Sequence, residues 1–401
     1  MGKGSNSSGL RRYNERVLIH FLRQLGQASK FELSRLAQLT PQAVTRIVDD
    51  LEAAGMVQQM GKIQRGLGQP STMYAINPQG AYAIGANVGR SDVQLLLMDF
   101  AGTVVGKVAH EFEVPDPDFL LEKIDQGIRY LSDSLSLEAR ERLVGVGLAM
   151  PWFMGAWTKE LNMSEALAER WNQIHFDREV ARLTHLPVLL ENDCSAAAVA
   201  ELQFGQGVEV KNFLYVYIGT FVGGGLVLGG ELVSGIHGNA GALASMPVAP
   251  SKLDSCPPLE APFETLVNRA SIYVLRRHLC AHGFKINNIS ELAGLLPAAQ
   301  PLVDEWLEDC AQALVIAIFS ATGVLDLEAV VIDGNLPREL VHQLVTRVAE
   351  LVEQLPHSGL FVPQILPGKI GVDARAIGGA ILPLYTHFSP DKSVMLTGGD
   401  S

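Results

Sequence analysis

Two adjacent polar residues, Asn192 and Asp193, follow a short apolar segment at residues 188–191 and are the pair in this sequence best suited to chemistry. A carboxylate accepts hydrogen bonds from two hydroxyl groups of a polyol, and as a base it deprotonates an oxygen that attacks a phosphoryl group. The same pair also fits an Asx turn or the cap of a following helix. Alone, the pair leaves a ligand-binding role and a structural role open.

A glycine-rich stretch, residues 219–225, comes shortly after this pair. Glycine lets backbone N–H groups approach a phosphate without a Cβ in the way. Glycines in a strand–turn–strand unit also allow close packing. The stretch is therefore compatible with both roles.

Basic residues gather near the N-terminus. Residues 1–80 contain ten Lys and Arg against five Asp and Glu, a net charge of +5; the whole chain carries −12, so the remainder carries −17. A basic module joined to an acidic body is typical of DNA binding by one end, because phosphate neutralisation is local. Chance asymmetry is the alternative.

Three helices are predicted within this basic segment. Apolar spacing predicts the first at residues 14–24. A capping box at Ser29–Glu32 starts the second, which ends near Gln38, and Thr40-Pro41 supplies an N-cap and a first-turn proline for the third. The third helix would be a recognition helix, whose polar face suits phosphates and base edges in a major groove, although a solvated face gives the same pattern.

A hairpin is predicted after the third helix. Strand-like residues 56–60 and 71–76 flank a glycine-rich loop that carries cations. Such a loop is typical of a wing that approaches the DNA backbone or minor groove. The residues that we expect to contact DNA are Arg11, Arg12, Lys30, Gln42, Thr45, Arg46, Lys62, Arg65 and Gln69.

The rest of the chain has an α/β pattern. Strands are predicted at 83–89, 93–99, 104–106, 143–149, 188–191, 213–219, 224–228 and 329–332, and helices at 120–135, 301–325 and 373–384. The strands from residue 213 onward begin what looks like a second copy of the plan that starts at residue 83. We expect a DNA-binding domain at 1–80, two α/β lobes at 81–195 and 196–390, and a flexible tail at 391–401.

Composition limits the class of protein. With 401 residues, 48% hydrophobic and 18% charged, the chain is long enough for two or three globular domains and is not generally disordered. Its four cysteines are isolated from one another, so we expect reduced thiols. The polar first nine residues do not resemble a signal peptide, and no run reaches the ~18 apolar residues of a membrane span. We expect a cytoplasmic protein without a membrane partner.

Six segments together resemble the ROK family (repressors, open reading frames and kinases). They are residues 32–37 and 45–51 in the basic segment, and 191–198, 218–225, 238–241 and 371–380 in the body. The resemblance implies an N-terminal winged helix-turn-helix joined to a two-lobed, actin-like (ribonuclease H-like, sugar-kinase-like) body. In the family's kinases, the residue that matches Asp193 is the catalytic base and the one that matches Asn192 binds the sugar.

The same resemblance extends to two further ligand-binding candidates and to the glycine-rich stretch. Glu264 matches another sugar-contacting carboxylate. Trp152 stands in the sugar loop, where the family has Pro-Gly, and its indole could narrow the pocket or stack on the apolar face of a sugar. Residues 219–225 match the second phosphate-binding turn. The expected ligand-binding residues are thus Trp152, Asn192, Asp193 and Glu264.

Three departures from the family's kinases argue against catalysis. Asn87 stands where the first phosphate loop has a metal-organising aspartate, and residues 241–245 lack the Glu and His of the family's sugar- and zinc-binding stretch. The cysteine-rich zinc loop is reduced to residues 254–258 with Cys256 alone, and one cysteine cannot make a tetrahedral thiolate site. We therefore expect no catalytic residues, no metal and no cofactor.

These observations predict a transcription regulator, a repressor of a carbohydrate-utilisation operon that senses a sugar or sugar derivative. Its expected partners are operator DNA, the effector and further copies of itself in a homodimer or homotetramer. An ATP-dependent sugar kinase and a body that binds another protein in place of a sugar are the alternatives.

Overall fold

The computed structural model describes residues 7–64, 70–158, 161, 163–259, 261–286, 289–295, 297–356 and 358–390. The chain forms two compact units. Unit 1 contains residues 1–148, 155–190 and 379–401, and unit 2 contains residues 149–154 and 191–378. The boundaries expected near residues 80 and 195 remain predictions.

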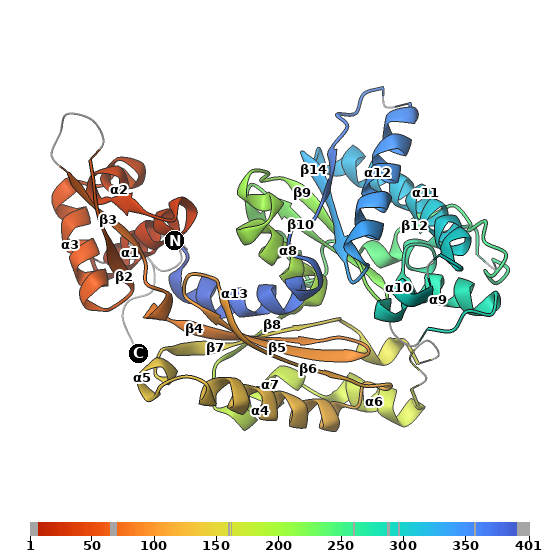
Figure 1. The fold of residues 1–401 in the computed structure, drawn as a ribbon, viewed down its shortest axis with the longest axis horizontal. Coiled ribbons are helices and arrows are strands. Elements are labelled where there is room, and N and C mark those ends of the chain that lie inside the picture. Colours follow the sequence, from red (N-terminus) through yellow and green to blue (C-terminus); the bar gives the residue numbers. More distant parts are fainter. Residues whose placement is uncertain are drawn as a thin grey trace. The chain divides into compact units, whose positions relative to one another are not determined.

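The first part of unit 1, which we call the head (residues 7–80), contains the three helices and the hairpin expected from the sequence (Figure 1). Its elements are α1 (Ser7–Leu25), β1 (Ala28–Ser29), α2 (Lys30–Ala37), α3 (Pro41–Ala53), β2 (Val57–Ile63), β3 (Ser71–Ile76) and the 3-10 turn η1 (Pro78–Gly80). The strands form one sheet in the order β1-β3-β2.

Local sequence explains the ends of the head's second helix. The Ser29 hydroxyl accepts from the Glu32 backbone N–H at 3.2 Å, and the Glu32 carboxylate accepts from the Ser29 backbone N–H at 2.9 Å. This is a complete capping box. Gln38 ends the helix in the left-handed conformation, with φ of 54°.

The remainder of unit 1 is built on a five-stranded sheet with the order β6-β5-β4-β7-β8. Figure 1 shows α4 and α7 on one face of this sheet and α13 on the other. The elements are β4 (Tyr82–Val88), β5 (Asp92–Asp99), β6 (Val104–Glu111), α4 (Pro117–Asp133), α5 (Leu137–Arg140), β7 (Leu143–Met150), η2 (Met154–Ala156), α6 (Glu165–Gln173), α7 (Phe176–Thr184), β8 (Val188–Asn192) and α13 (Ala374–Phe388). The ends of four of them belong to unit 2: residues 149–150 of β7, 154 of η2, 191–192 of β8 and 374–378 of α13.

Within unit 1, helix α1 is bonded to elements outside the head. Arg23 donates to the Phe100 carbonyl at 3.2 Å, and its guanidinium lies 5.2 Å from the Phe100 ring centroid. Burial lowers the pKa of Arg23 to about 10. Arg16 donates to the Ser389 carbonyl at 3.2 Å, and the neighbouring Phe388 ring lies 4.6 Å from that of Phe100.

Unit 2 is built on a second five-stranded sheet with the order β11-β10-β9-β14-β15. Numbered along the chain, both large sheets thus have the order third, second, first, fourth, fifth strand, which confirms the repeated plan expected from residue 213 onward. The strands are β9 (Phe213–Ile218), β10 (Val222–Leu228), β11 (Glu231–Leu232), β14 (Ala329–Gly334) and β15 (Gln364–Pro367).

Helices and short elements complete unit 2. Helix α8 packs against β9 and β10, and α12 packs against β14 and β15. The remaining elements are α8 (Asp193–Phe204), η3 (Gln206–Val208), η4 (Leu243–Ser245), β12 (Pro247–Val248), β13 (Glu264–Thr265), η5 (Leu266–Asn268), α9 (Ile272–Ala281), η6 (Ile289–Glu291), α10 (Leu292–Leu295), α11 (Gln300–Leu325), α12 (Arg338–Gln354) and η7 (Gly371–Asp373).

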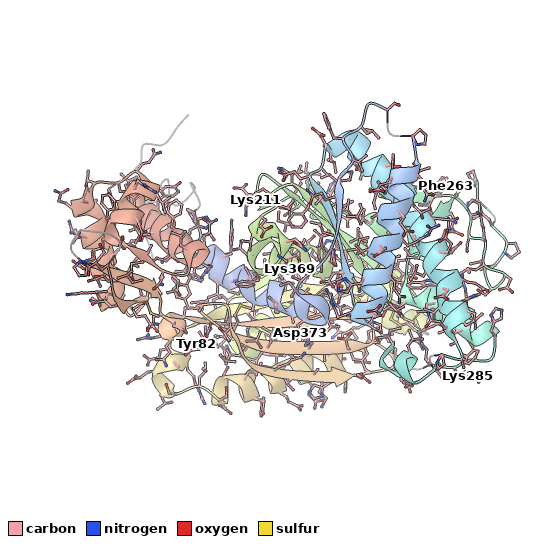
Figure 2. The ribbon with its side chains drawn as sticks, turned by 45° about the horizontal axis from the view of Figure 1, so that its top comes forward. Tyr82, Lys211, Phe263, Lys285, Lys369 and Asp373 are labelled. Carbon is pink, nitrogen blue, oxygen red and sulfur yellow. The ribbon has the colours of Figure 1, made fainter. Side chains whose placement is uncertain are left out.

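A buried carboxylate anchors two loops of unit 2. The Glu201 side chain accepts from the backbone N–H groups of Gln206 at 2.8 Å and Lys369 at 3.1 Å; Figure 2 labels Lys369. Burial raises the pKa of Glu201, and these N–H donors counteract that rise.

Helix α11 is long and apolar enough to cross a membrane by length and composition alone, but half of the relevant window is buried inside the protein. Core helices pass the same test. Its contacts with α9 and α12 are those of a core helix.

Candidate functional site

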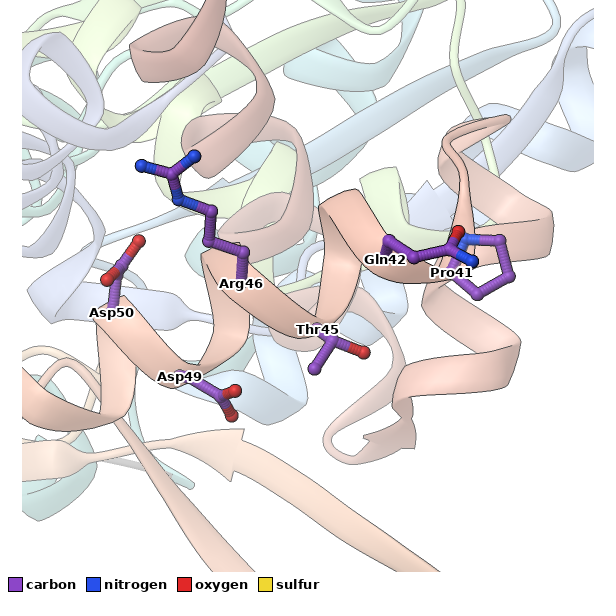
Figure 3. Close-up of a pocket in the computed structure, with 6 residues that line it drawn as sticks. All are labelled: Pro41, Gln42, Thr45, Arg46, Asp49 and Asp50. Carbon is purple, nitrogen blue, oxygen red and sulfur yellow. The ribbon is translucent and has the colours of Figure 1, made fainter.

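Helix α3 presents one buried face and one exposed face. Its N-cap, Thr40, accepts from the Ala43 backbone N–H at 3.3 Å, and proline follows at the first helical position. The buried face consists of Val44, Ile47, Val48 and Leu51. The opposite face lines an open hollow of about 470 Å³ (Figure 3) with Pro41, Gln42, Thr45, Arg46, Asp49 and Asp50.

Salt bridges link this exposed face of α3 to cations on neighbouring helices. Arg11 on α1 lies 2.5 Å from Asp50, and Lys30 at the start of α2 is ion-paired with Asp49. Two of the predicted DNA-contacting cations are therefore partly neutralised by α3 carboxylates. Within the described residues, no ion pair is recorded for Arg46.

The other predicted DNA-contacting residues fall in three places. Arg12 lies exposed on α1, and Lys62 lies exposed on β2, the strand that pairs with β3. Arg65 and Gln69 lie outside the described residues. Within the described residues, Gln42, Thr45 and Arg46 share one face of α3, while Lys62 belongs to the hairpin.

The Asn192–Asp193 pair lies at the start of helix α8 in unit 2. The Asn192 side-chain oxygen accepts from the backbone N–H groups of Cys194 at 3.1 Å and Ser195 at 3.2 Å. The helix-cap role that the sequence left open is thus present. The preceding residue, Glu191, has its pKa raised by burial and lowered in part by the N–H of Asn192.

Asp193 is nearly buried and faces a cation. Its side chain is 4% exposed, and its Oδ2 lies 3.5 Å from Nη1 of Arg375 at the start of α13. The guanidinium of Arg375 also lies 5.1 Å from the ring centroid of Tyr217 on β9. A buried carboxylate oriented by a neighbouring cation can accept hydrogen bonds from hydroxyl groups. The sequence had not singled out Arg375, although it lies in the 371–380 motif.

Trp152 and Glu264 have local partners. The Trp152 indole N–H donates to the Gly238 carbonyl at 2.6 Å. The Glu264 Oε1 accepts from the Thr265 backbone N–H and the Asn268 side chain, each at 2.8 Å. Trp152, Asn192, Asp193 and Glu264 all belong to unit 2. Within the described residues, no recorded hydrogen bond joins Glu264 to Asn192 or Asp193.

The glycines of the 219–225 stretch have a packing role. A Cβ on Gly223 would lie 2.4 Å from Cys194 Sγ, and a Cβ on Gly225 would lie 2.5 Å from Ala198 Cβ. Helix α8 can therefore lie on β10 only because these positions have no side chain. The structural role that the sequence left open is present here too.

Two positions at which the resemblance implies metal-binding chemistry lack the groups for it. Asn87 on β4 is fully buried, and neither of its amide atoms has a hydrogen-bond partner within the described residues. Its neutral side chain brings no charge for a metal. In the loop at 254–258, Cys256 Sγ accepts from Arg277 at 2.9 Å. With a single cysteine, this loop does not fit a cysteine-rich zinc site.

The comparison with known families decides the assignment. The ROK family model matches residues 83–385. The chain belongs to the ROK family. An uncharacterized protein of Sinorhizobium fredii is 26% identical over 378 residues, covering 94% of this chain and 91% of the relative. The xylose repressor of Bacillus subtilis is 25% identical over 243 residues, covering 60% of this chain and 61% of the repressor.

Solved ROK structures share the fold. A ROK family transcriptional regulator, a homologue of the E. coli MLC protein, superimposes with a TM-score of 0.69 and 21% identity, covering 97% of this chain and 100% of the regulator. A ROK family glucokinase from Streptomyces griseus superimposes with a TM-score of 0.57 and 19% identity, covering 75% of this chain and 99% of the kinase. The kinase-like fold of the body is thus shared with both ROK regulators and ROK sugar kinases.

Proposed function

We propose that this ROK protein is a cytoplasmic transcriptional regulator whose head is a winged helix-turn-helix that binds operator DNA. The observation that carries the proposal is the exposed face of α3, where Gln42, Thr45 and Arg46 lie together on a capped helix. Amide and guanidinium groups on one helix face suit base edges in a major groove. The repressors among its relatives support this function.

The salt bridges on α3 refine the proposal. Asp49 and Asp50 would repel phosphates, so the pairs with Lys30 and Arg11 offset an unfavourable charge. Arg46, for which no ion pair is present within the described residues, would then contact the base edges. Contacts with the DNA backbone, or from the wing, would come from Arg12, Lys62, Arg65 and Gln69. A homodimer would match two half-sites about one helical turn apart, and a homotetramer would carry two such pairs.

Binding to promoter DNA tests the head. Full-length protein is titrated against the fragment upstream of its own gene at several salt concentrations. We expect Arg46→Ala to weaken specific binding by roughly 5- to 150-fold, the loss of a base contact worth about 1–3 kcal/mol. Lys62→Ala should weaken binding to all sequences alike and reduce the salt slope by about one unit.

A body variant controls for general effects on the protein. Arg129→Ala on α4 removes an exposed cation that pairs with Asp125, and it should bind DNA like the wild type. The proposal fails if the wild-type protein has no salt-sensitive preference for any promoter fragment. It fails equally if Arg46→Ala binds as tightly as Arg129→Ala.

We further propose that the body binds a sugar or sugar derivative through Asp193, with Trp152, Asn192 and Glu264 as further contacts, and that binding relieves repression of a carbohydrate-utilisation operon. The nearly buried Asp193 carboxylate beside Arg375 supports this assignment. Because the Asn192 side-chain oxygen already caps α8, only its amide N–H₂ would donate to a ligand. The proposed site binds the sugar without phosphorylating it, since Asn87 brings no charge for the metal that phosphoryl transfer uses.

Thermal shift with a panel of sugars tests the effector site. A sugar that binds the folded state raises the melting temperature, and Asp193→Asn should weaken its affinity by roughly 10- to 150-fold, as for a lost hydrogen bond to a charged group. Asp133→Asn, which removes an exposed carboxylate on α4, is the control.

A coupled kinase assay is run on the same sugar panel. Turnover of ATP with a hexose would overturn the proposal of a sensor and show that the protein is a sugar kinase. Neither stabilisation nor turnover, with DNA binding intact, would overturn the sugar effector and favour a protein partner for the body.

A further inference from the structure

A cluster of metal-ligating side chains lies in unit 2, away from Asp193. His278 and His282 are four residues apart at the end of helix α9, so they share one helix face. Asp254 comes from the loop between β12 and β13. One ligand atom from each of these three residues lies within 4.8 Å of the others.

The hydrogen bond made by His282 Nδ1 leaves the other ring nitrogen, Nε2, facing Asp254. Its Nδ1 lies 2.9 Å from the His278 carbonyl oxygen, which can only accept, so Nδ1 carries the proton in that bond. The neutral ring then has its lone pair on Nε2. That nitrogen lies 3.4 Å from Oδ2 of Asp254.

His278 has the complementary arrangement. Its side chain is fully buried, and its Nε2 lies 3.0 Å from Oε2 of Glu305 on α11. A carboxylate on one ring nitrogen orients the ring and makes the other a better ligand, as around many bound metals. That other nitrogen, Nδ1, lies 3.8 Å from Oδ1 of Asp254 and 2.9 Å from the Ser255 hydroxyl.

We propose that Asp254, His278 and His282 bind a divalent transition-metal ion, zinc in the first instance. Donor atoms about 2.1 Å from a tetrahedral zinc are about 3.4 Å from one another. The separations of 3.4 and 3.8 Å between the carboxylate oxygens and the two imidazoles are close to this value. The Ser255 hydroxyl or a solvent molecule completes the coordination, and two imidazoles with one carboxylate suit zinc.

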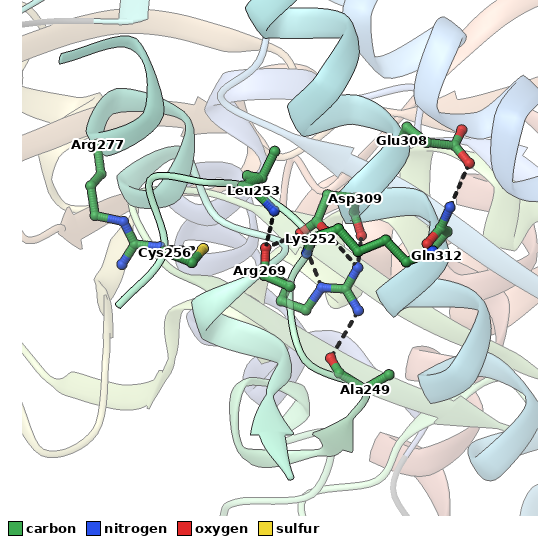
Figure 4. Close-up of polar contacts among 10 residues, drawn as sticks. Ala249, Lys252, Leu253, Cys256, Arg269, Arg277, Glu308, Asp309 and Gln312 are labelled. Atoms are coloured by element: carbon green, nitrogen blue, oxygen red, sulfur yellow. Dashed lines mark hydrogen bonds and ion pairs between the residues drawn. The ribbon is translucent and has the colours of Figure 1, made fainter. Parts of the chain in front are cut away.

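The loop that carries Asp254 is fixed in position by buried contacts. Asp309 on α11 accepts from the Lys252 backbone N–H at 3.0 Å and from the Ser251 hydroxyl at 2.9 Å (Figure 4). The same carboxylate is held by Arg269 at 2.8 Å. Asp254 lies two residues after Lys252, so its backbone is already restrained before a metal binds. This restraint lowers the entropy cost of metal binding.

The metal would join the 249–256 loop to helix α9. Asp254 is exposed and His282 half-buried, whereas His278 is fully buried, so the ion would enter from solvent and bind against a fixed imidazole. The sequence-based expectation of no metal rested on the single Cys256. The spacing of His278 and His282 is itself one that zinc sites use, but its carboxylate partner is distant in sequence.

Metal binding to the full-length protein, without a histidine tag, tests the site. The protein is treated with a chelator, dialysed against zinc or cobalt, and analysed for bound metal. We expect about one zinc per chain, and visible absorption of the cobalt form typical of four-coordinate geometry. His282→Gln and Asp254→Asn should each reduce affinity at least about tenfold, and Glu305→Gln about 10- to 100-fold through the orientation of His278.

A second histidine provides the matched control. His342 lies exposed on α12, so His342→Gln should bind metal like the wild type. Circular dichroism establishes that each variant is folded, and His282→Gln and Asp254→Asn change only side chains with solvent access. Absence of bound zinc in the folded wild-type protein overturns the site. So does wild-type affinity in both His282→Gln and Asp254→Asn, because the cluster would then be an ion-pair network alone.

Discussion

Gly378→Ala is expected to destabilise the protein by more than about 3 kcal/mol and to lower its melting temperature by roughly 10 °C. Gly378 lies on α13, and a Cβ at this position would be 1.8 Å from the carbonyl oxygen of Ala196 on α8. The clash is with backbone, so no side-chain rotation relieves it. Thermal and urea unfolding followed by circular dichroism measure the effect.

A glycine in open space is the control for this substitution. Gly323 lies exposed in α11, where the nearest atom to an added Cβ is 4.0 Å away. Alanine is a better helix former than glycine, so Gly323→Ala should stabilise by about 0.5–1 kcal/mol. If Gly378→Ala unfolds at the wild-type temperature, the close contact between α13 and α8 is wrong.

Arg269→Met is the second substitution with a large expected effect, a loss of about 3–5 kcal/mol, because it leaves the Asp309 carboxylate buried without its cation. The side chains of Arg269 and Asp309 are 2% and 3% exposed. The guanidinium makes two bonds to the carboxylate, at 3.0 and 2.8 Å, and one to the Ala249 carbonyl at 2.9 Å (Figure 4). Urea unfolding measures the difference.

The adjacent residue of α11 supplies a matched ion pair at the surface. Glu308 pairs with Arg347 at 2.6 Å, with side chains 39% and 31% exposed. Arg347 lowers the pKa of Glu308 through this contact. Since solvent screens exposed pairs, Arg347→Met should cost less than about 1 kcal/mol. Equal losses in Arg269→Met and Arg347→Met would contradict the buried character of the Arg269–Asp309 pair.

Much of the head could be predicted because its signals are local. A capping box at Ser29 and the Thr40-Pro41 start both appear in the structure as caps of α2 and α3. The first helix begins at Ser7 rather than at residue 14, since the polar residues ahead of it carry no apolar periodicity to detect. Helix α12 was not predicted, although Leu340, Val341, Leu344 and Val345 give it a buried face.

The candidate ligand-binding site could also be predicted only in part. The Asn192–Asp193 motif was found from sequence, but its cation, Arg375, is 182 residues distant from Asp193 along the chain and meets it only through tertiary structure. The packing role of Gly223 and Gly225 likewise depends on α8 lying across β10. Contacts of this kind connect segments with no shared local pattern, so composition and spacing cannot reveal them.

The contacts of helix α1 affect how the head, as the proposed DNA-binding domain, would find its operator. A DNA-binding domain on a flexible linker samples many orientations and binds DNA independently of the domain to which it is joined. Here Arg23 is half-buried against Phe100 and Arg16 is hydrogen-bonded to Ser389, so α1 is held against the rest of unit 1. The orientation of α3 then follows the orientation of the rest of unit 1. A small rotation of unit 1 would therefore move the exposed face of α3 through a larger distance than it moves residues near the rotation axis.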